Sequence, residues 1–224
     1  APLSRKIDTA ALFNVPPGKA LKAAEAAVAA GRPDATNLIE QAKAGLKNGG
    51  DAKQQRQLAL LERWLQPASD PVDLASVGGA SCYLSDAKWD KASSGWAGTP
   101  RDRWGAEPQF GQGLFLHIAG KLHEKGLPAH CPAEHVFATS GKWARLKATV
   151  GLRDGTASSA RSIFTVVGDG KQLFRSKQLK PGQTEDIDLD ISGVKQLQLL
   201  TESGTKSTHT CWAVWGSPQV VREK

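Results

Sequence analysis

The sequence predicts a mainly β protein, a β-sandwich or jelly roll, preceded by a small three-helix α segment. Two observations support this prediction. The composition changes near residue 67, with Ala, Leu, Lys and Gln dominant before it and Gly, Ser, Thr, Val and Trp after it. Beyond residue 80, short apolar or alternating runs are separated by Gly, Asp and Pro without intervening helical patterns, which is typical of an antiparallel sandwich.

Residues 1–66 show the apolar spacing of three short amphipathic helices. Proline at the start of the second, Asp51 at the start of the third, and glycines after the first two supply the usual boundaries. A segment of this length buries a thin core, so we expect it to lean on the next domain or to be part of a longer helical one. The expected helices are Gly18–Ala30, a second from Pro33 up to Asn48, and a third from Asp51 up to Pro67.

Residues 67–79 are rich in Pro, Ser, Asp and Gly and are predicted to form a linker, which leaves 80–224 as the β domain. Turn sequences at Asp154-Gly155 and Gly168-Asp169-Gly170 separate apolar runs in this domain. The runs expected to form strands are 114–119, 144–150, 162–167, 187–191 and 196–200.

The net charge of +7 is spread along the chain. Residues 1–70 hold 10 basic and 7 acidic residues, and the remainder holds 19 and 15, with no basic run of five or six. A dispersed excess of this size is typical of a solvated surface, so we do not expect nucleic-acid binding. No stretch approaches the roughly 20 apolar residues of a membrane helix, so we expect no membrane insertion.

Motifs of catalysis are absent from the sequence: it has no GxSxG, HExxH or P-loop pattern, and no spacing selects a pair of catalytic acids. The chain is therefore predicted not to be an enzyme. The three cysteines match no zinc-ribbon spacing, and the cluster of His130, Cys131 and His135 lacks an evident fourth ligand.

The region with the strongest indication of ligand binding is a Gly/Pro/Arg-rich segment from Ser93 to Gly105, which carries Trp96, Arg103 and Trp104. Exposed indoles on a loop offer flat apolar faces on which sugar C–H groups stack, and a guanidinium donates in a planar geometry. Buried indoles are the ordinary alternative for any tryptophan. The segment indicates a carbohydrate ligand held on loops of a rigid sandwich.

A series of motifs over residues 80–220 resembles the NPCBM-type carbohydrate-binding module, a galactose-binding-like jelly roll of bacterial glycoside hydrolases and surface proteins. The series occurs in the family's order, which makes it more specific than any single motif. The matching stretches are Tyr83–Trp89 with Gly95-Trp96, Gly120–Leu127 with Ala129-His130, Val150–Leu152, Phe164–Leu173 with Ser176, and Asp190–Val194 with Leu197 and Leu199.

The resemblance implies a non-catalytic accessory module of an exported bacterial protein that binds sugars, galactose-configured ones first. The resemblance also allows a structural calcium ion, further domains in a larger parent protein, and a secreted, periplasmic or cell-surface location. We expect the ligand on loops at one end of the sandwich, where Trp96 and Trp104 stack, Arg103 donates, and His130 and His209 make polar contacts. These residues lie in Gly/Pro-rich or motif-matching loops and not in apolar strand runs. The first residues, Ala1-Pro2-Leu3-Ser4, fit a mature end after signal cleavage or the edge of an excised segment.

Several positions depart from the family pattern. His123 stands for an aromatic residue, Arg153 for an acid, and Thr208 and Cys211 for the two acids of a C-terminal Asp-His-x-Asp-Trp motif. These departures favour the alternative function, a protein-interaction or structural domain that kept the jelly roll and lost its sugar site. First and last strands of such jelly rolls lie close together, so a Cys82–Cys211 disulfide is the expected pairing if one exists; three buried, reduced thiols are the alternative.

Overall fold

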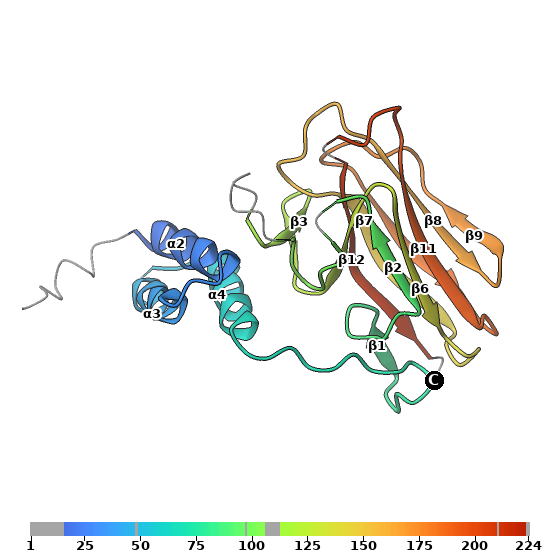
Figure 1. Cartoon of the computed structure of the whole chain (residues 1–224), viewed down its shortest axis with the longest axis horizontal. Helices are drawn as coiled ribbons and strands as arrows, with labels where there is room; N and C mark the ends of the chain where they lie inside the picture. The colour runs from blue at the N-terminus through green and yellow to red at the C-terminus, as the bar shows by residue number, and fades with distance from the viewer. Residues whose placement is uncertain (1–15, 48, 97, 106–112, 210, 223–224) are drawn as a thin grey trace, which may run out of the picture. The chain divides into compact units, whose positions relative to one another are not determined.

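The structure, a computed structural model, describes residues 16–47, 49–96, 98–105, 113–209 and 211–222 (Figure 1). The chain divides into two compact units, and the first division along the chain falls between Ala68 and Ser69. The described helices lie in the first unit and the described strands in the second. The N-terminal part of the helical segment, residues 1–15, lies outside the described residues.

The helical unit contains the three expected helices: α2 (Pro17–Ala29), α3 (Ala35–Leu46) and α4 (Ala52–Trp64). Asp51 caps α4, accepting a 2.8 Å bond from the Gln54 N–H while the Gln54 side chain accepts from the Asp51 N–H. Helix α3 begins two residues later than expected. The carboxylate of its N-cap residue Asp34 is engaged by the Arg32 guanidinium and makes no capping bond.

Small side chains form much of the helical core, so the helix backbones can approach closely. The core of this unit is thin, as its length predicts. Its buried residues are Ala20, Leu21, Ala24, Ala27, Ala35, Ile39, Ala42, Leu46, Leu58, Leu60 and Leu61.

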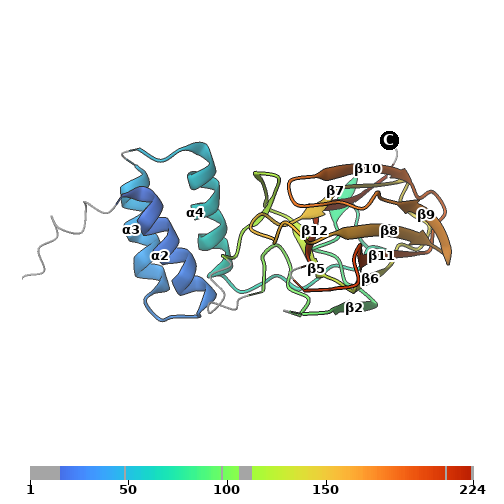
Figure 2. The same ribbon diagram turned by 90° about the horizontal axis from the view of Figure 1, so that it is seen from above.

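The second unit is a sandwich of two five-stranded antiparallel sheets with an additional two-stranded hairpin (Figures 1 and 2). One sheet has the order β1-β12-β7-β10, with β5 also paired to β12, and the other has the order β2-β6-β11-β8-β9. The hairpin is β3-β4. The strands are β1 (Ser81–Tyr83), β2 (Lys91–Ser94), β3 (Leu116–Ile118), β4 (Lys121–His123), β5 (Gly126–His130), β6 (Ala133–Ala138), β7 (Arg145–Leu152), β8 (Ser162–Gly168), β9 (Lys171–Arg175), β10 (Thr184–Asp190), β11 (Gln196–Ser203) and β12 (Trp212–Val221).

Each of the five expected runs overlaps a strand, namely β3, β7, β8, β10 and β11. The predicted turn at Asp169-Gly170 joins β8 to β9, and both residues have the positive φ, 48° and 79°, that a tight hairpin turn requires. The mainly β sandwich predicted from the sequence is confirmed.

The core between the two sheets is dominated by buried aliphatic and aromatic side chains. Trp215 packs edge-on against Phe164, with ring centroids 5.3 Å apart, and its Nε1 donates to Thr201 Oγ1 at 3.0 Å. Part of the predicted linker contributes to this core, because Leu74 is 1% exposed and packs in it, and the backbone of Val72 pairs with that of Ala87. The β unit accordingly begins at Ser69 and consists of Ser69–Gly105 and Leu114–Lys224.

Two histidines are enclosed by the sandwich. His135 is fully buried, its ring lies 5.7 Å from that of Trp89, and neither ring nitrogen has a hydrogen-bond partner among the described residues. Burial lowers the pKa of His135 to about 4, and the charge of Arg101 acts in the same direction. His123 is 2% exposed, and burial followed by the charge of Lys121 lowers its pKa to about 4.

These histidines predict acid sensitivity. A pKa near 4 in the folded state and about 6.5 in the unfolded state means that the unfolded state binds more protons between these values. The free energy of unfolding should be highest above about pH 6.5 and fall toward pH 4, by up to about 3 kcal/mol for each histidine. Urea unfolding between pH 4 and 8 measures this, and His135→Phe should flatten the profile. An unchanged slope in that variant would contradict the assignment.

Candidate functional site

Four connections between strands meet at one end of the sandwich: β5–β6, β7–β8, β9–β10 and β11–β12. The register establishes this, because the end of β5 faces the start of β12 at His130 and Trp212, and the end of β11 faces the start of β8 at Ser203 and Ser162. Loops at the end of a rigid sandwich are the usual position for ligand-binding side chains. We call this the disulfide end, because a disulfide joins two of its connections.

That disulfide links Cys131, directly after β5, to Cys211, directly before β12. The expected Cys82–Cys211 pairing is wrong, and Cys82 is a buried free thiol. The reason is the direction of β12. Cys82 in β1 pairs with Val220 near the end of β12, nine residues beyond Cys211, which corresponds to about 30 Å along a strand. The first and last strands are neighbours, as expected, but the two cysteines lie at opposite ends of them.

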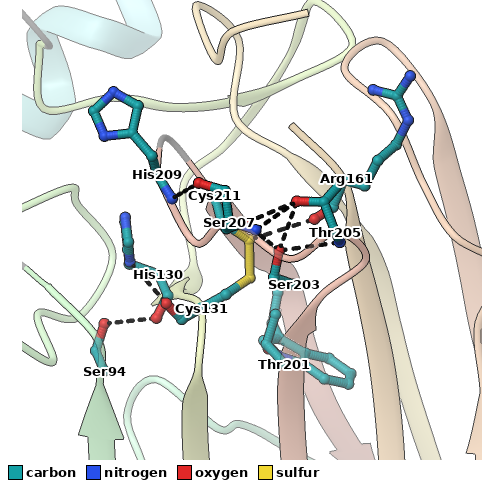
Figure 3. The surroundings of a disulfide bond; sticks show 11 residues. Ser94, His130, Cys131, Arg161, Thr201, Ser203, Thr205, Ser207, His209 and Cys211 are labelled. Atoms are coloured by element: carbon teal, nitrogen blue, oxygen red, sulfur yellow. Dashed lines mark hydrogen bonds between the residues drawn. A yellow bond between two sulfur atoms is a disulfide. The ribbon is translucent and has the colours of Figure 1, made fainter. Parts of the chain in front are cut away.

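A chain of hydroxyl groups orders the β11–β12 loop (Figure 3). Ser203 Oγ and Thr205 Oγ1 donate to the Ser207 carbonyl at 2.6 and 2.8 Å. Ser207 Oγ then accepts from the His209 N–H at 3.1 Å. Together with the disulfide at Cys211, these bonds fix the backbone that presents His209, whose side chain is exposed.

His130 lies on the same side of the disulfide as His209 (Figure 3). Its Nδ1 donates to the Cys131 carbonyl at 3.1 Å, which leaves Nε2 for other partners. Burial lowers the pKa of His130; the bond to Cys131 opposes this shift, and the positive charge of His209 adds to it. The structure thus brings together these two predicted site residues.

Trp96 contacts His130 from the segment after β2. Its ring is 5.8 Å from that of His130 at an angle of 59°, and the side chain is half-buried. Ser94 Oγ donates to the Trp96 carbonyl at 2.9 Å, which holds the start of the segment beside β5. Trp96, His130 and His209 therefore form a compact group at the disulfide end.

Trp104 is a correction to the sequence-based expectation. It is 1% exposed and packs in a small core with Leu116, Ile118 and Val214, so its indole offers no face to a ligand. The Arg153 guanidinium lies 5.5 Å from the centre of the Trp104 ring. The half-buried Trp212, which sequence reasoning did not place in the site, lies 6.2 Å from Trp104 and next to the disulfide in sequence.

Arg103 follows Asp102, which is hydrogen-bonded to the start of β5. The neighbouring Asp102 accepts bonds from the Gly126 N–H at 3.0 Å and from Lys125 at 2.8 Å, and the Asp102 N–H donates to the Gly126 carbonyl at 2.9 Å. Gly126 begins β5, four residues along the strand from His130. These bonds place the backbone next to Arg103 beside the start of β5, and Arg103 as a ligand donor stays a prediction.

The cluster of His130, Cys131 and His135 has no thiolate to offer a metal ion, because Cys131 is in the disulfide. Within the described ranges, no group of three or more His, Cys, Asp or Glu side chains is arranged to hold a metal ion. In that same part of the chain, no helix has the length and apolar character needed to cross a membrane.

The fold and this loop end define a jelly-roll β-sandwich of the kind found in carbohydrate-binding modules. Residues 80–221 match the NPCBM/NEW2 domain, and the chain belongs to this family. A curated relative, a putative endo-alpha-N-acetylgalactosaminidase from Renibacterium salmoninarum, is 26% identical over 141 residues. The match covers 62% of this chain and 9% of that relative, so the chain spans a small part of its length.

Solved structures show the same fold. The CBM51 module from Clostridium perfringens GH95, in complex with methyl-galactose, aligns with a TM-score of 0.56 and 22% identity over 63% of this chain and 99% of that one. The tandem CBM51 modules of a family 98 glycoside hydrolase from Streptococcus pneumoniae SP3-BS71 align with a TM-score of 0.55 and 21% identity, over 70% of this chain and 52% of that one. At these identities the likeness establishes the fold.

Proposed function

We propose that the β unit binds carbohydrate without catalysis, as an accessory module of an exported bacterial protein, with galactose-configured sugars as the first candidates. Residues 80–224 form the binding domain in this proposal, and 1–66 a separate helical segment. Membership of a carbohydrate-binding family supports the ligand class. The observation that carries the proposal is the group of Trp96, His130 and His209 held at one end of the sandwich.

The chemistry of this group suits a sugar. The half-buried Trp96 has part of its ring available for stacking against C–H bonds, and Trp212 supplies a second half-buried indole nearby. His130 Nε2 and the exposed His209 ring exchange hydrogen bonds with hydroxyls. A few such contacts on a preformed surface should give about 4–6 kcal/mol, a dissociation constant between millimolar and tens of micromolar.

Trp96→Ala tests this site. Removing a stacking indole should weaken binding by about 1–2 kcal/mol, while the fold remains intact because the side chain is only half-buried. Titration calorimetry with galactose and N-acetylgalactosamine measures the affinity. Trp89→Ala is the matched control: Trp89 is also half-buried, but it lies in the connection before β2 at the opposite end, under the Arg101 guanidinium. An equal loss in both variants would contradict the assignment.

A second function, a protein-interaction or structural role, is favoured by one observation. Cys211 occupies a motif position where the resemblance leads us to expect an acid, and its sulfur is in the disulfide and is not available as a ligand. A glycan array with the full chain separates the two functions. Binding to at least one glycan supports the sugar-binding proposal, and an array without bound glycans supports the protein-interaction role.

A further inference from the structure

The two ends of the sandwich differ in charge. The four connections at the disulfide end carry five basic residues, Arg153, Arg161, Lys177, Lys180 and Lys206, and one acid, Asp154. The connections that reach the opposite end, 84–90, 124–125, 139–144, 169–170 and 191–195, carry four basic and four acidic residues. The β2–β3 connection, which leaves the disulfide end after Ser94 and carries Trp96, adds two basic and two acidic residues. With this connection included, the positive excess still lies at the end that holds the candidate site.

The acid at this end is already engaged. Asp154 Oδ2 accepts the Gly120 N–H at 2.9 Å. Among the nearby strand residues, Glu202 pairs with Arg175 at 2.7 Å, and the Glu185 carboxylate accepts the Lys177 N–H at 3.2 Å. In the described part of the chain, the side chains of Lys177, Lys180 and Lys206 make no ion pair, so their charges are not neutralised there.

The β11–β12 loop, which carries His209 of the candidate site, also has basic residues without acidic ones. Residues 204–211 contain Lys206 and His209 and no acidic residue. The hydroxyl chain from Ser203 to His209 and the disulfide at Cys211 restrain the loop that carries both positive groups. The charge of His209 also disfavours protonation of His130, a repulsion that a bound anion would relieve.

The charged side chains at the disulfide end favour one class of sugar over another. Neutral sugars are held well by carboxylates, which accept strong hydrogen bonds from hydroxyl groups. The disulfide end instead presents ammonium and imidazole groups, which donate to acceptors with negative charge. We propose that the ligand of this site is an acidic carbohydrate, one that bears a carboxylate or a sulfate group. This inference rests on the proposed sugar-binding function and specifies its substrate class.

Matched pairs of sugars test the inference with the full chain. Titrations compare galactose with galacturonic acid, and N-acetylgalactosamine with its 6-sulfate; inorganic sulfate serves as the bare-anion control. The acidic member of at least one pair should bind about ten-fold more tightly than its neutral partner and than sulfate alone. Its affinity should fall several-fold as sodium chloride rises from about 50 to 500 mM, because salt screens exposed charges. The two pairs distinguish a carboxylate from a sulfate ligand.

A pair of charge reversals locates the effect. Lys206→Glu should weaken binding of the preferred acidic sugar about three- to ten-fold and leave its neutral partner unchanged. Lys195→Glu, the same change in the β10–β11 connection at the opposite end, should alter neither. Equal affinities for acidic and neutral sugars would overturn this inference and leave the sugar-binding function standing. Equal effects of the two reversals would also overturn it, and a chain that binds none of these sugars would overturn both.

Discussion

Replacing Trp104 by alanine is expected to destabilise the β unit by about 3–5 kcal/mol. The indole is 1% exposed, and its removal opens a cavity among Leu116, Ile118 and Val214 that the two sheets are too well packed to fill. Contacts with Trp212, 6.2 Å away, and with the Arg153 guanidinium are lost as well. Chemical unfolding monitored by near-ultraviolet circular dichroism measures the change in the free energy of unfolding.

Trp96→Ala is the matched control for this experiment. It removes the same side chain from the same connection, but from a half-buried position, so its cost in stability should be clearly smaller. The two variants should therefore lose different properties: Trp104→Ala should lose mainly stability, and Trp96→Ala should lose mainly sugar affinity. A Trp104→Ala variant as stable as the parent protein would mean that the small core around this residue is not formed.

The disulfide provides the other large expected effect. The double variant Cys131→Ser/Cys211→Ser should lose about 2–5 kcal/mol of stability, since the bond joins residues 80 apart in sequence and restricts the unfolded chain. Binding should weaken too, because the bond fixes the loop that presents His209 beside β5. Thermal unfolding and sugar titration, each with and without the two substitutions, measure both effects.

Cys82→Ala controls for the loss of a cysteine as such. Its thiol is buried in the core and donates to the Tyr83 carbonyl at 3.4 Å, and burial raises the pKa of this thiol, which keeps it protonated. This variant should lose much less stability than the double variant and keep its affinity. If a reducing agent left the stability of the parent protein unchanged, the contribution assigned to the Cys131–Cys211 bond would be contradicted.

Local patterns were enough to predict the three described helices, five of the twelve described strands and the fold class. The apolar period of helix α4, with Asp51 at its start, and the alternation in β8 before the Asp169-Gly170 turn depend on side chains close in sequence. The physical reason is that helix and strand periodicities are set by which face of each element is buried. His130 and His209 were also predicted as neighbours in the site, but from motifs and not from periodicity.

Only the tertiary structure decided which residues meet across the chain. Sequence could not show that Trp104 turns inward while Trp96 keeps part of its ring exposed, because burial of a loop residue depends on what packs over it. It also could not pair the cysteines. The first and last strands were expected to be neighbours, and they are. However, β1 pairs with the far end of β12, which separates Cys82 from Cys211. Cys211 is bonded instead to Cys131, which follows the end of β5. Register is set by the packing of whole strands, and a disulfide forms only where that packing brings two sulfur atoms within bonding distance.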